Sequence, residues 1–424
     1  MNVIIKPGKV RGSIRVPSSK SIGHRAVICA GLAHGKSLIS SVSPSKDINA
    51  TINGLKQMGV SCQYTGKDLS VENRGTGTDN PLIDCKESGS TLRFLIPIAI
   101  ILSGGAVFTG CGRLGERPLE VYRNLFTSMG ISWEQAPSGF PLTVKGSLKS
   151  GEYEIDGSIS SQFITGLMFA LPLLDGTSVI RIKNTLESRP YIDLTMDTLK
   201  KFGINIINNS YREFIIPGRQ HYSPRNYSVE CDYSQAAFFL AAGSLSGSVD
   251  VCGLNKTSLQ GDSVIVDILS HMGAELAWKD TTLHASRSPL TGTTIDASQC
   301  PDLVPILAVI GSLSQGTTSI INAGRLRLKE SDRLSAMTKE LKKLGAHIEE
   351  LTDGLIIHGK PQLSGGVVSS WNDHRVAMSL GIAALSCSCP VTITDAQCVD
   401  KSYPLFWEDL KRIGGDIVEQ HMGN

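Results

Sequence analysis

The stretch Leu55-Lys56-Gln57-Met58-Gly59-Val60 reads as the last turn of a helix, a glycine and the first residue of a strand. The same form recurs five more times along the chain, with its glycine at Gly130, Gly203, Gly273, Gly345 and Gly414. Successive glycines lie 71, 73, 70, 72 and 69 residues apart. One glycine just past a helix end is common, because that position favours the left-handed conformation. Six at a near-constant spacing predict six structural repeats of about 71 residues that account for the whole chain.

Each repeat contains both strands and helices. The glycine is followed by two short β-type segments separated by a turn, as in 346–349 and 354–357. Ahead of the glycine, a strand, a loop and an apolar helix are followed by a second strand, a second loop and an amphipathic helix. The predicted fold class is therefore α/β.

The last repeat is incomplete and predicts how the domains are divided. It has only the strand 416–418 before the chain ends, so we expect residues 2–5 at the start of the chain to supply its missing partner. Three repeats per domain then give a middle domain of residues 20–230 and a discontinuous domain of residues 1–19 plus 231–424. Because the chain crosses between the two domains twice, we expect a hinge there.

Composition excludes several classes of protein. The 424 residues carry 41 Lys and Arg against 39 Asp and Glu, a net charge of +2, which excludes binding of nucleic acid through bulk basicity. The run Phe94–Leu102 is the longest apolar stretch, and its nine residues predict a buried helix because a membrane span needs about 20. The start of the chain does not have the pattern of a signal peptide. The sequence contains no CxxC pair, so nothing in it predicts a structural zinc site. We therefore expect a cytoplasmic protein.

The loop at 18–21 is the first candidate binding site. Ser21 and Arg25 are four residues apart on one face of the predicted helix, and Lys20 lies at its start. Cations at a helix N-terminus oppose the helix dipole unless an anion binds there. Free N–H groups, a hydroxyl, Lys and Arg together suit a phosphate or carboxylate. A solvated, capped helix start is the alternative interpretation.

The second loops of four repeats also place cations at predicted helix starts. In one of them we expect Lys329 and Arg333 to share a helical face and Glu330 to pair with Arg333. An ordinary salt-bridged first turn would explain any single loop, but a shared anionic ligand explains all four. These loops are residues 113–118, 187–191, 329–333 and 400–404.

Five ordered motifs carry a resemblance to a known family. From residue 5 to residue 410 the chain resembles the enolpyruvyl transferases, and among them the 5-enolpyruvylshikimate-3-phosphate synthases. The motifs are Pro17-Ser18-Ser19-Lys20-Ser21-Ile22-Gly23-His24-Arg25, Arg113-Leu114-Gly115-Glu116-Arg117-Pro118, Ser160-Ser161-Gln162, Lys329-Glu330-Ser331-Asp332-Arg333 and Asp373-His374-Arg375.

The resemblance implies a fold of two hinged domains, each of three βαβαββ units, that close over the substrates. It implies transfer of the enolpyruvyl group of phosphoenolpyruvate to the 5-hydroxyl of shikimate 3-phosphate, through a tetrahedral intermediate and with release of phosphate. This is a step of the shikimate pathway towards chorismate and the aromatic amino acids. It implies small-molecule substrates only, no cofactor, no metal, no nucleic acid or membrane partner, and a monomer.

The resemblance also implies site residues. Asp302 would accept the proton of the attacking hydroxyl, and Glu330 with Lys20 would handle the proton delivered to the methylene carbon. Shikimate 3-phosphate would be held by Lys20, Ser21, Arg25, Ser160, Ser161, Gln162, Ser188, Tyr191, Asp302 and Lys329. Phosphoenolpyruvate would be held by Lys20, Gly89, Arg117, Gln162, Arg333, His374, Arg375 and Lys401.

Two departures from the family pattern and two alternatives stay open. Phe94 replaces the proline that often follows the motif arginine, which bears on sensitivity to glyphosate, and Arg325 stands where an asparagine often binds the shikimate phosphate. The nearest alternative is UDP-N-acetylglucosamine 1-carboxyvinyltransferase, which has the same fold and donor. A remoter one is a non-catalytic scaffold of six repeats, such as a nucleic-acid clamp.

Overall fold

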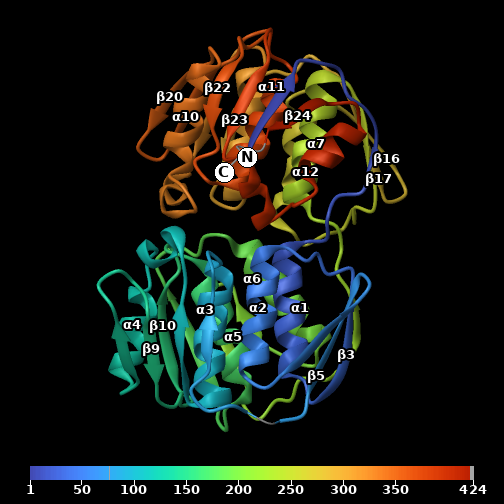
Figure 1. Cartoon of the computed structure of the whole chain (residues 1–424). Helices are drawn as coiled ribbons and strands as arrows, with labels where there is room; N and C mark the ends of the chain where they lie inside the picture. Colours follow the sequence, from blue (N-terminus) through green and yellow to red (C-terminus); the bar gives the residue numbers. More distant parts are fainter. Residues whose placement is uncertain (76, 421–424) are drawn as a thin grey trace. The chain divides into compact units, whose positions relative to one another are not determined.

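The computed structural model describes residues 1–75 and 77–420, and it divides the chain into two compact units (Figure 1). Unit 1 combines Met1–Pro17 with the described chain from Glu230 onward, and unit 2 is Ser18–Val229. The boundaries expected from the sequence were 1–19 with 231–424, and 20–230.

The described residues form six four-stranded sheets, three in each unit, which share one topology. Two neighbouring strands run parallel, the third is antiparallel to the second, and the fourth is antiparallel to the third; Tyr153 of β10, for example, lies opposite Ile180 of the parallel strand β11. Each sheet with its two helices makes one βαβαββ unit, which confirms the predicted α/β class and its six repeats.

The elements of unit 2 follow the chain in order. The strands are β3 (Gly35–Ser40), β4 (Ser61–Thr65), β5 (Asp68–Asn73), β6 (Leu82–Asp84), β7 (Gly105–Thr109), β8 (Ser132–Gln135), β9 (Leu142–Lys145), β10 (Glu152–Asp156), β11 (Ser178–Lys183), β12 (Ile207–Asn209), β13 (Glu213–Ile216) and β14 (Asn226–Ser228). The helices are α1 (Lys20–Leu32), α2 (Lys46–Gln57), α3 (Gly89–Ser103), α4 (Glu120–Ser128), α5 (Ser161–Ala170) and α6 (Arg189–Lys201), with 3₁₀ turns η1 (Gly112–Glu116) and η2 (Leu171–Leu173).

Unit 1 repeats the pattern. Its strands are β1 (Asn2–Lys6), β2 (Arg11–Ile14), β15 (Ser248–Val251), β16 (Glu275–Lys279), β17 (Thr282–Ser286), β18 (Thr294–Asp296), β19 (Thr317–Ile321), β20 (His347–Leu351), β21 (Gly354–His358), β22 (Gly366–Ser369), β23 (Val391–Thr394) and β24 (Asp416–Gln420). Its helices are α7 (Tyr233–Ser246), α8 (Ile265–His271), α9 (Val304–Ser312), α10 (Arg333–Lys343), α11 (His374–Ala384) and α12 (Phe406–Arg412), with 3₁₀ turns η3 (Gly261–Val264), η4 (Pro301–Leu303), η5 (Gly324–Leu328) and η6 (Ala396–Lys401).

The six repeat glycines all have positive φ angles: +90°, +78°, +88°, +96°, +83° and +103° in chain order. A residue with a Cβ is strained in this conformation. The spacing that predicted the repeats therefore has a backbone cause, since each glycine turns the chain from the second helix of a repeat into its next strand.

The first strand of the chain completes the last sheet. β1 lies between β23 and β24, antiparallel to both, with Ile4 opposite Thr392 on one side and Val418 on the other. In Figure 1 the blue β1 accordingly runs beside the red strands near the end of the chain.

The two repeats at the chain crossings exchange their first strands. β2 leads along the chain into α1 of unit 2 but pairs in parallel with β15 of unit 1. β14 leads into α7 of unit 1 but pairs in parallel with β3 of unit 2. The pairing partners of these two short strands were not predicted from the sequence.

The first helix of each repeat is the core of its unit. In α3, every residue from Thr91 to Ile100 is buried, and α9 is buried from Val304 to Ser312. The run Phe94–Leu102 thus lies within a buried helix, as predicted. Second helices such as α2 bury one face only. Among the described residues, no helix combines the length and apolarity needed to cross a bilayer.

The conformation of the repeat glycines can be tested at Gly130. An added Cβ there meets nothing within 4 Å, so Gly130→Ala introduces backbone strain alone. We expect unit 2 to lose about 1 kcal/mol of unfolding free energy. Urea unfolding followed by the fluorescence of Trp133, which lies on β8 just after Gly130 and is the one tryptophan of unit 2, measures the loss.

Gly8→Ala is the matched control, because its Cβ would also meet open space but its φ is not positive. Equal unfolding midpoints for Gly130→Ala and wild type would contradict this account of the repeat.

Candidate active site

The start of α1 gathers the first set of predicted residues in unit 2. Ser19 caps the helix, its Oγ accepting from the Ile22 amide at 3.4 Å. Lys20 begins the helix, and its Nζ lies 2.8 Å from Asp47 Oδ2, with only 19% of the lysine side chain exposed. Ser21 and Arg25 share a face as predicted, because Arg25 Nη1 donates to the Ser21 carbonyl at 2.7 Å.

Arg25 is held on all sides by unit 2. Its Nε donates to Thr195 Oγ1 at 2.8 Å and its Nη2 to the Tyr191 carbonyl at 2.9 Å, both on α6. The guanidinium also lies 5.5 Å from the centre of the Phe94 ring. Burial lowers the pKa of Arg25 to about 10, so the group stays charged at neutral pH. A buried, rigid cation at a helix start is a preorganised anion site.

His24, next to Arg25, does not share this role. Its Nδ1 lies 2.8 Å from Thr51 Oγ1. Burial, and secondly the charges of Lys20 and Arg25, hold the pKa of His24 well below its ordinary value. A neutral, buried imidazole beside two cations is a structural residue rather than a proton donor.

At the start of α3, Gly89 lies close to Arg117 and Gln162, two other residues predicted to bind phosphoenolpyruvate. A Cβ at Gly89 would lie 2.9 Å from Arg117 Nη1 and 3.6 Å from Gln162 Oε1. Arg93, one turn into α3, donates from Nη1 to Gln162 Oε1 at 2.8 Å, while Gln162 Nε2 donates to Ser90 Oγ at 3.0 Å. Arg93 was not among the predicted site residues, although it stands in the same loop-and-helix stretch as Gly89.

The other serines of unit 2 also lie at helix starts. Ser160 caps α5 by accepting from the Gln162 amide at 3.3 Å, and Ser161 is the first residue of that helix. Ser188 precedes α6 in a left-handed conformation with φ of +56°, and it is buried. Tyr191 follows in the first turn of α6.

In unit 1 the buried guanidinium of Arg333 joins three carboxylates. Its side chain is 1% exposed. Its nitrogens lie 2.9 Å from Asp302 Oδ1, 2.8 Å from Glu330 Oε2 and 2.9 Å from Asp373 Oδ2. With Arg375 and Lys329 these residues form what we call the Arg333 cluster, in which three cations meet three anions.

Asp302 has three cations around it. Besides Arg333, its Oδ2 lies 3.2 Å from Arg375 Nη2 and its Oδ1 lies 3.6 Å from Lys329 Nζ. Burial alone would raise its pKa, but Arg375, Lys329 and Arg333 outweigh burial and hold the pKa of Asp302 well below its ordinary value. Asp302 is therefore an ionised carboxylate whose basicity these cations suppress.

One sequence expectation about this loop is wrong. Lys329 and Arg333 do not share a helical face, because α10 begins only at Arg333 and Lys329 lies in the preceding loop. Asp332 caps the helix by accepting from the Ser335 amide at 3.1 Å, which excludes the earlier residues from it. The predicted pairing of Glu330 with Arg333 is confirmed at 2.8 Å.

The start of α11 completes the cluster. Asp373 caps this helix, its Oδ1 accepting from the Arg375 amide at 2.9 Å, so one carboxylate serves both the cap and Arg333. His374 is buried at the first position of the helix. Lys401, at the end of η6, donates to the Asn372 carbonyl at 2.8 Å just before this cap.

A second buried carboxyl, Asp262, lies in the electrostatic field of the cluster and was not predicted. Its Oδ2 accepts from Ser234 Oγ at the start of α7. Burial, and secondly the charge of Asp302, raise its pKa to about 7, whereas Arg375 lowers it. The pKa values of the two carboxyls are thus pushed apart. No motif marks Asp262 in the sequence, since only the fold brings η3 to this helix start.

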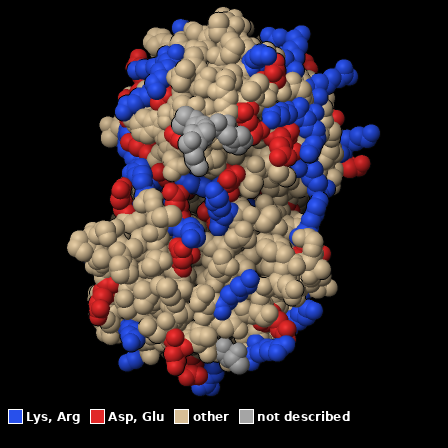
Figure 2. Space-filling model, viewed as in Figure 1, with Lys and Arg blue, Asp and Glu red and all other residues tan. Residues whose placement is uncertain are grey.

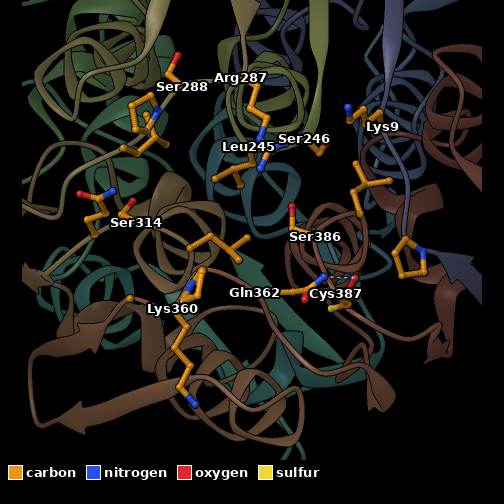
Figure 3. A pocket seen from close by; sticks show the side chains of 18 of the residues that line it. Lys9, Leu245, Ser246, Arg287, Ser288, Ser314, Lys360, Gln362, Ser386 and Cys387 are labelled. Atoms are coloured by element: carbon orange, nitrogen blue, oxygen red, sulfur yellow. Dashed lines mark hydrogen bonds between the residues drawn. The ribbon is translucent and has the colours of Figure 1, made fainter.

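Figure 3 shows a hollow in unit 1 that is lined by residues at the C-terminal ends of α7, α9 and α11. It measures about 900 Å³ and is lined by Leu245 and Ser246 from the end of α7, Leu313 and Ser314 just past α9, and Ser386 just past α11. The Arg333 cluster lies at the N-terminal ends of α9 and α11, where anions are stabilised, whereas C-terminal ends disfavour them. The hollow contains none of the predicted site residues.

On the face drawn in Figure 2, Lys and Arg lie among Asp and Glu over each unit, and a row of Lys and Arg follows the right-hand edge of unit 1.

Comparisons with known proteins agree with the motifs. A family model for EPSP synthase (3-phosphoshikimate 1-carboxyvinyltransferase) matches residues 4–410. The chain is 51% identical over 432 residues to a 3-phosphoshikimate 1-carboxyvinyltransferase of Clostridium novyi (strain NT), covering 100% of this chain and 99% of the relative. It is 52% identical over 430 residues to that of Clostridium acetobutylicum, covering 100% of both.

A solved structure of EPSP synthase from Acinetobacter baumannii superposes with a TM-score of 0.84 at 25% identity, covering 99% of this chain and 100% of that one. Fold, motifs and full-length relatives all agree, and the chain belongs to the EPSP synthase family of 3-phosphoshikimate 1-carboxyvinyltransferases.

Proposed function

We propose that the helix starts of unit 2 and the Arg333 cluster of unit 1 together perform the family's reaction in this chain. That reaction transfers the carboxyvinyl group of phosphoenolpyruvate to the 5-hydroxyl of shikimate 3-phosphate and releases phosphate. The observation that carries the proposal is Asp302, a carboxylate held by three cations at the start of a buried helix.

In this proposal the substrate anions bind where helix starts and cations coincide. Shikimate 3-phosphate is held by Lys20, Ser21, Arg25, Ser160, Ser161, Gln162, Ser188, Tyr191, Asp302 and Lys329. Phosphoenolpyruvate is held by Lys20, Gly89, Arg117, Gln162, Arg333, His374, Arg375 and Lys401. The support is local: Arg25 is rigid and charged, and the missing side chain at Gly89 leaves space beside Arg117 Nη1.

Substrate binding also changes the basicity of Asp302. Before substrates arrive, Arg333 and Arg375 suppress it. A phosphate or carboxylate that binds these guanidinium groups shares their positive charge, so the pKa of Asp302 rises towards that of a useful base. The base then becomes active only when the donor is present.

The proton transfers follow from this arrangement. Glu330, with Lys20, delivers a proton to the methylene carbon of phosphoenolpyruvate, which makes the neighbouring carbon electrophilic. The 5-hydroxyl oxygen attacks that carbon while Asp302 takes its proton, giving a tetrahedral ketal phosphate. Loss of a proton from the new methyl group and departure of phosphate restore the double bond.

Acceptor specificity tests the function directly. We expect the purified chain to release phosphate from phosphoenolpyruvate when shikimate 3-phosphate is present. It should release none above background with UDP-N-acetylglucosamine, the acceptor of the alternative enzyme. Phosphate release only with UDP-N-acetylglucosamine would contradict the assignment, and release with neither acceptor would favour the non-catalytic scaffold.

The role of Asp302 is tested by Asp302→Asn, which keeps the shape of the side chain but removes the base. We expect kcat to fall by about 100-fold or more, the usual contribution of a general base. The KM for phosphoenolpyruvate should not rise, because the three cations remain. Asp296→Asn, an exposed aspartate of β18 in the same repeat, is the control and should keep wild-type kcat. A kcat of Asp302→Asn equal to that of the control would remove Asp302 from the mechanism.

The space at Gly89 is tested by Gly89→Ala. The new methyl group would lie 2.8 Å from Arg93 Nη1 and 2.9 Å from Arg117 Nη1, so both guanidinium groups must move. We expect the KM for phosphoenolpyruvate to rise by about tenfold, equivalent to about 1.4 kcal/mol. The KM for shikimate 3-phosphate should change far less. Equal increases in both KM values, or none, would show that Gly89 does not shape the donor site; Gly8→Ala is the matched control.

A further inference from the structure

The hairpin of β20 and β21 brings two histidines and a glutamate together on the outer face of its sheet. His347 and Glu349 lie two residues apart on β20, so their side chains project from the same face. His358 on β21 lies directly opposite His347 in the strand register. One ligand atom from each of the three residues lies within 4.8 Å of the other two.

The two imidazoles lie close together. Their ring centroids are 4.5 Å apart and their planes meet at 46°. Together with the Glu349 carboxylate, the two imidazoles bring three potential metal-ligand atoms close to one another.

A third strand supports this geometry. Thr317 on β19 lies opposite His358 in the register, and its Oγ1 is 3.0 Å from His358 Nδ1. When Nδ1 donates its hydrogen to that hydroxyl, the lone pair is on Nε2. Metal-binding histidines usually have their second ring nitrogen fixed by such a hydrogen bond.

We propose that His347, Glu349 and His358 bind a divalent transition-metal ion of the Zn²⁺ class, with one position open to solvent. Imidazole and carboxylate are ligands that suit this class, and three protein ligands leave room for water. The site lies outside the proposed active-site residues and does not depend on the proposed function. The ammonium group of Lys360, two residues after His358, donates a hydrogen bond to the Gly345 carbonyl at 2.7 Å.

The position on the hairpin predicts what metal binding changes. The ligands occupy the open end of the hairpin, whereas the end of β20 next to the turn binds η5: Arg327 donates to Glu350 Oε1 at 2.6 Å and to the Leu351 carbonyl at 2.7 Å. The metal therefore joins the open ends of β20 and β21. It should raise the melting temperature by mass action and leave kcat unchanged.

Titration of the full chain with ZnCl₂, followed by calorimetry, tests the proposal. We expect His347→Ala and His358→Ala each to weaken one zinc site by at least about tenfold. His271→Ala is the control, because His271 is exposed at the end of α8 and is not part of this cluster. The substituted side chains lie at the surface, and circular dichroism verifies that the variants fold.

Absorption with Co²⁺ separates this site from the exposed thiols of Cys111 and Cys389. We expect cobalt spectra without a thiolate charge-transfer band and a zinc-induced rise in melting temperature that both histidine variants lose. Zinc isotherms and melting shifts of His347→Ala and His358→Ala equal to those of wild type would overturn the proposal. So would an absence of zinc binding to the wild-type chain.

Discussion

The buried guanidinium of Arg333 is the group on which the proposed chemistry depends. A charge with 1% exposure persists only if partners compensate for its lost hydration, and Arg333 has three carboxylate partners. Those partners come from η4, the loop before α10 and the cap of α11. One ion-pair network therefore fixes three separate segments of unit 1, so the site is preorganised by the same contacts that stabilise it.

Charge balance explains why this network can serve catalysis. Arg333, Arg375 and Lys329 face Asp302, Glu330 and Asp373, so the cluster is close to neutral before any substrate binds. In the proposed mechanism, an arriving substrate anion competes with Asp302 for the guanidinium groups, and Asp302 then becomes a stronger base. Asp262 adds to this picture, because burial and the charge of Asp302 raise its pKa to about 7. Two neighbouring carboxyl groups whose pKa values are shifted in opposite directions, as those of Asp302 and Asp262 are, are typical of acid–base sites.

The sequence could predict what is repeated and local, but not what depends on long-range pairing. The glycine spacing revealed the six repeats, because the glycine that follows the second helix of each repeat has a positive φ angle. The cationic loops could be predicted because their residues, such as Lys20 and Ser21, are neighbours in the sequence at a predicted helix start. The pairing of β2 with β15 and of β14 with β3 was not predicted, because strands of three or four residues carry no signal of their partner. Asp262 was missed for a related reason, since its neighbours arrive through tertiary packing. The metal-ligand cluster needs the register that places His347 opposite His358, and the predicted hinge stays a prediction.

In the proposed mechanism, cations suppress the basicity of Asp302 until anionic substrates bind to them. The direct measurement is a carbon-13 NMR titration of the aspartate carboxyls, with the Asp302 signal assigned by Asp302→Asn. The titration is run on the free protein and on its complex with shikimate 3-phosphate and an unreactive analogue of phosphoenolpyruvate. We expect the pKa of Asp302 to lie well below the ordinary value of about 3.9 in the free protein and to be higher in the complex. An ordinary pKa in the free protein, or the same pKa in both states, would contradict the proposed mechanism.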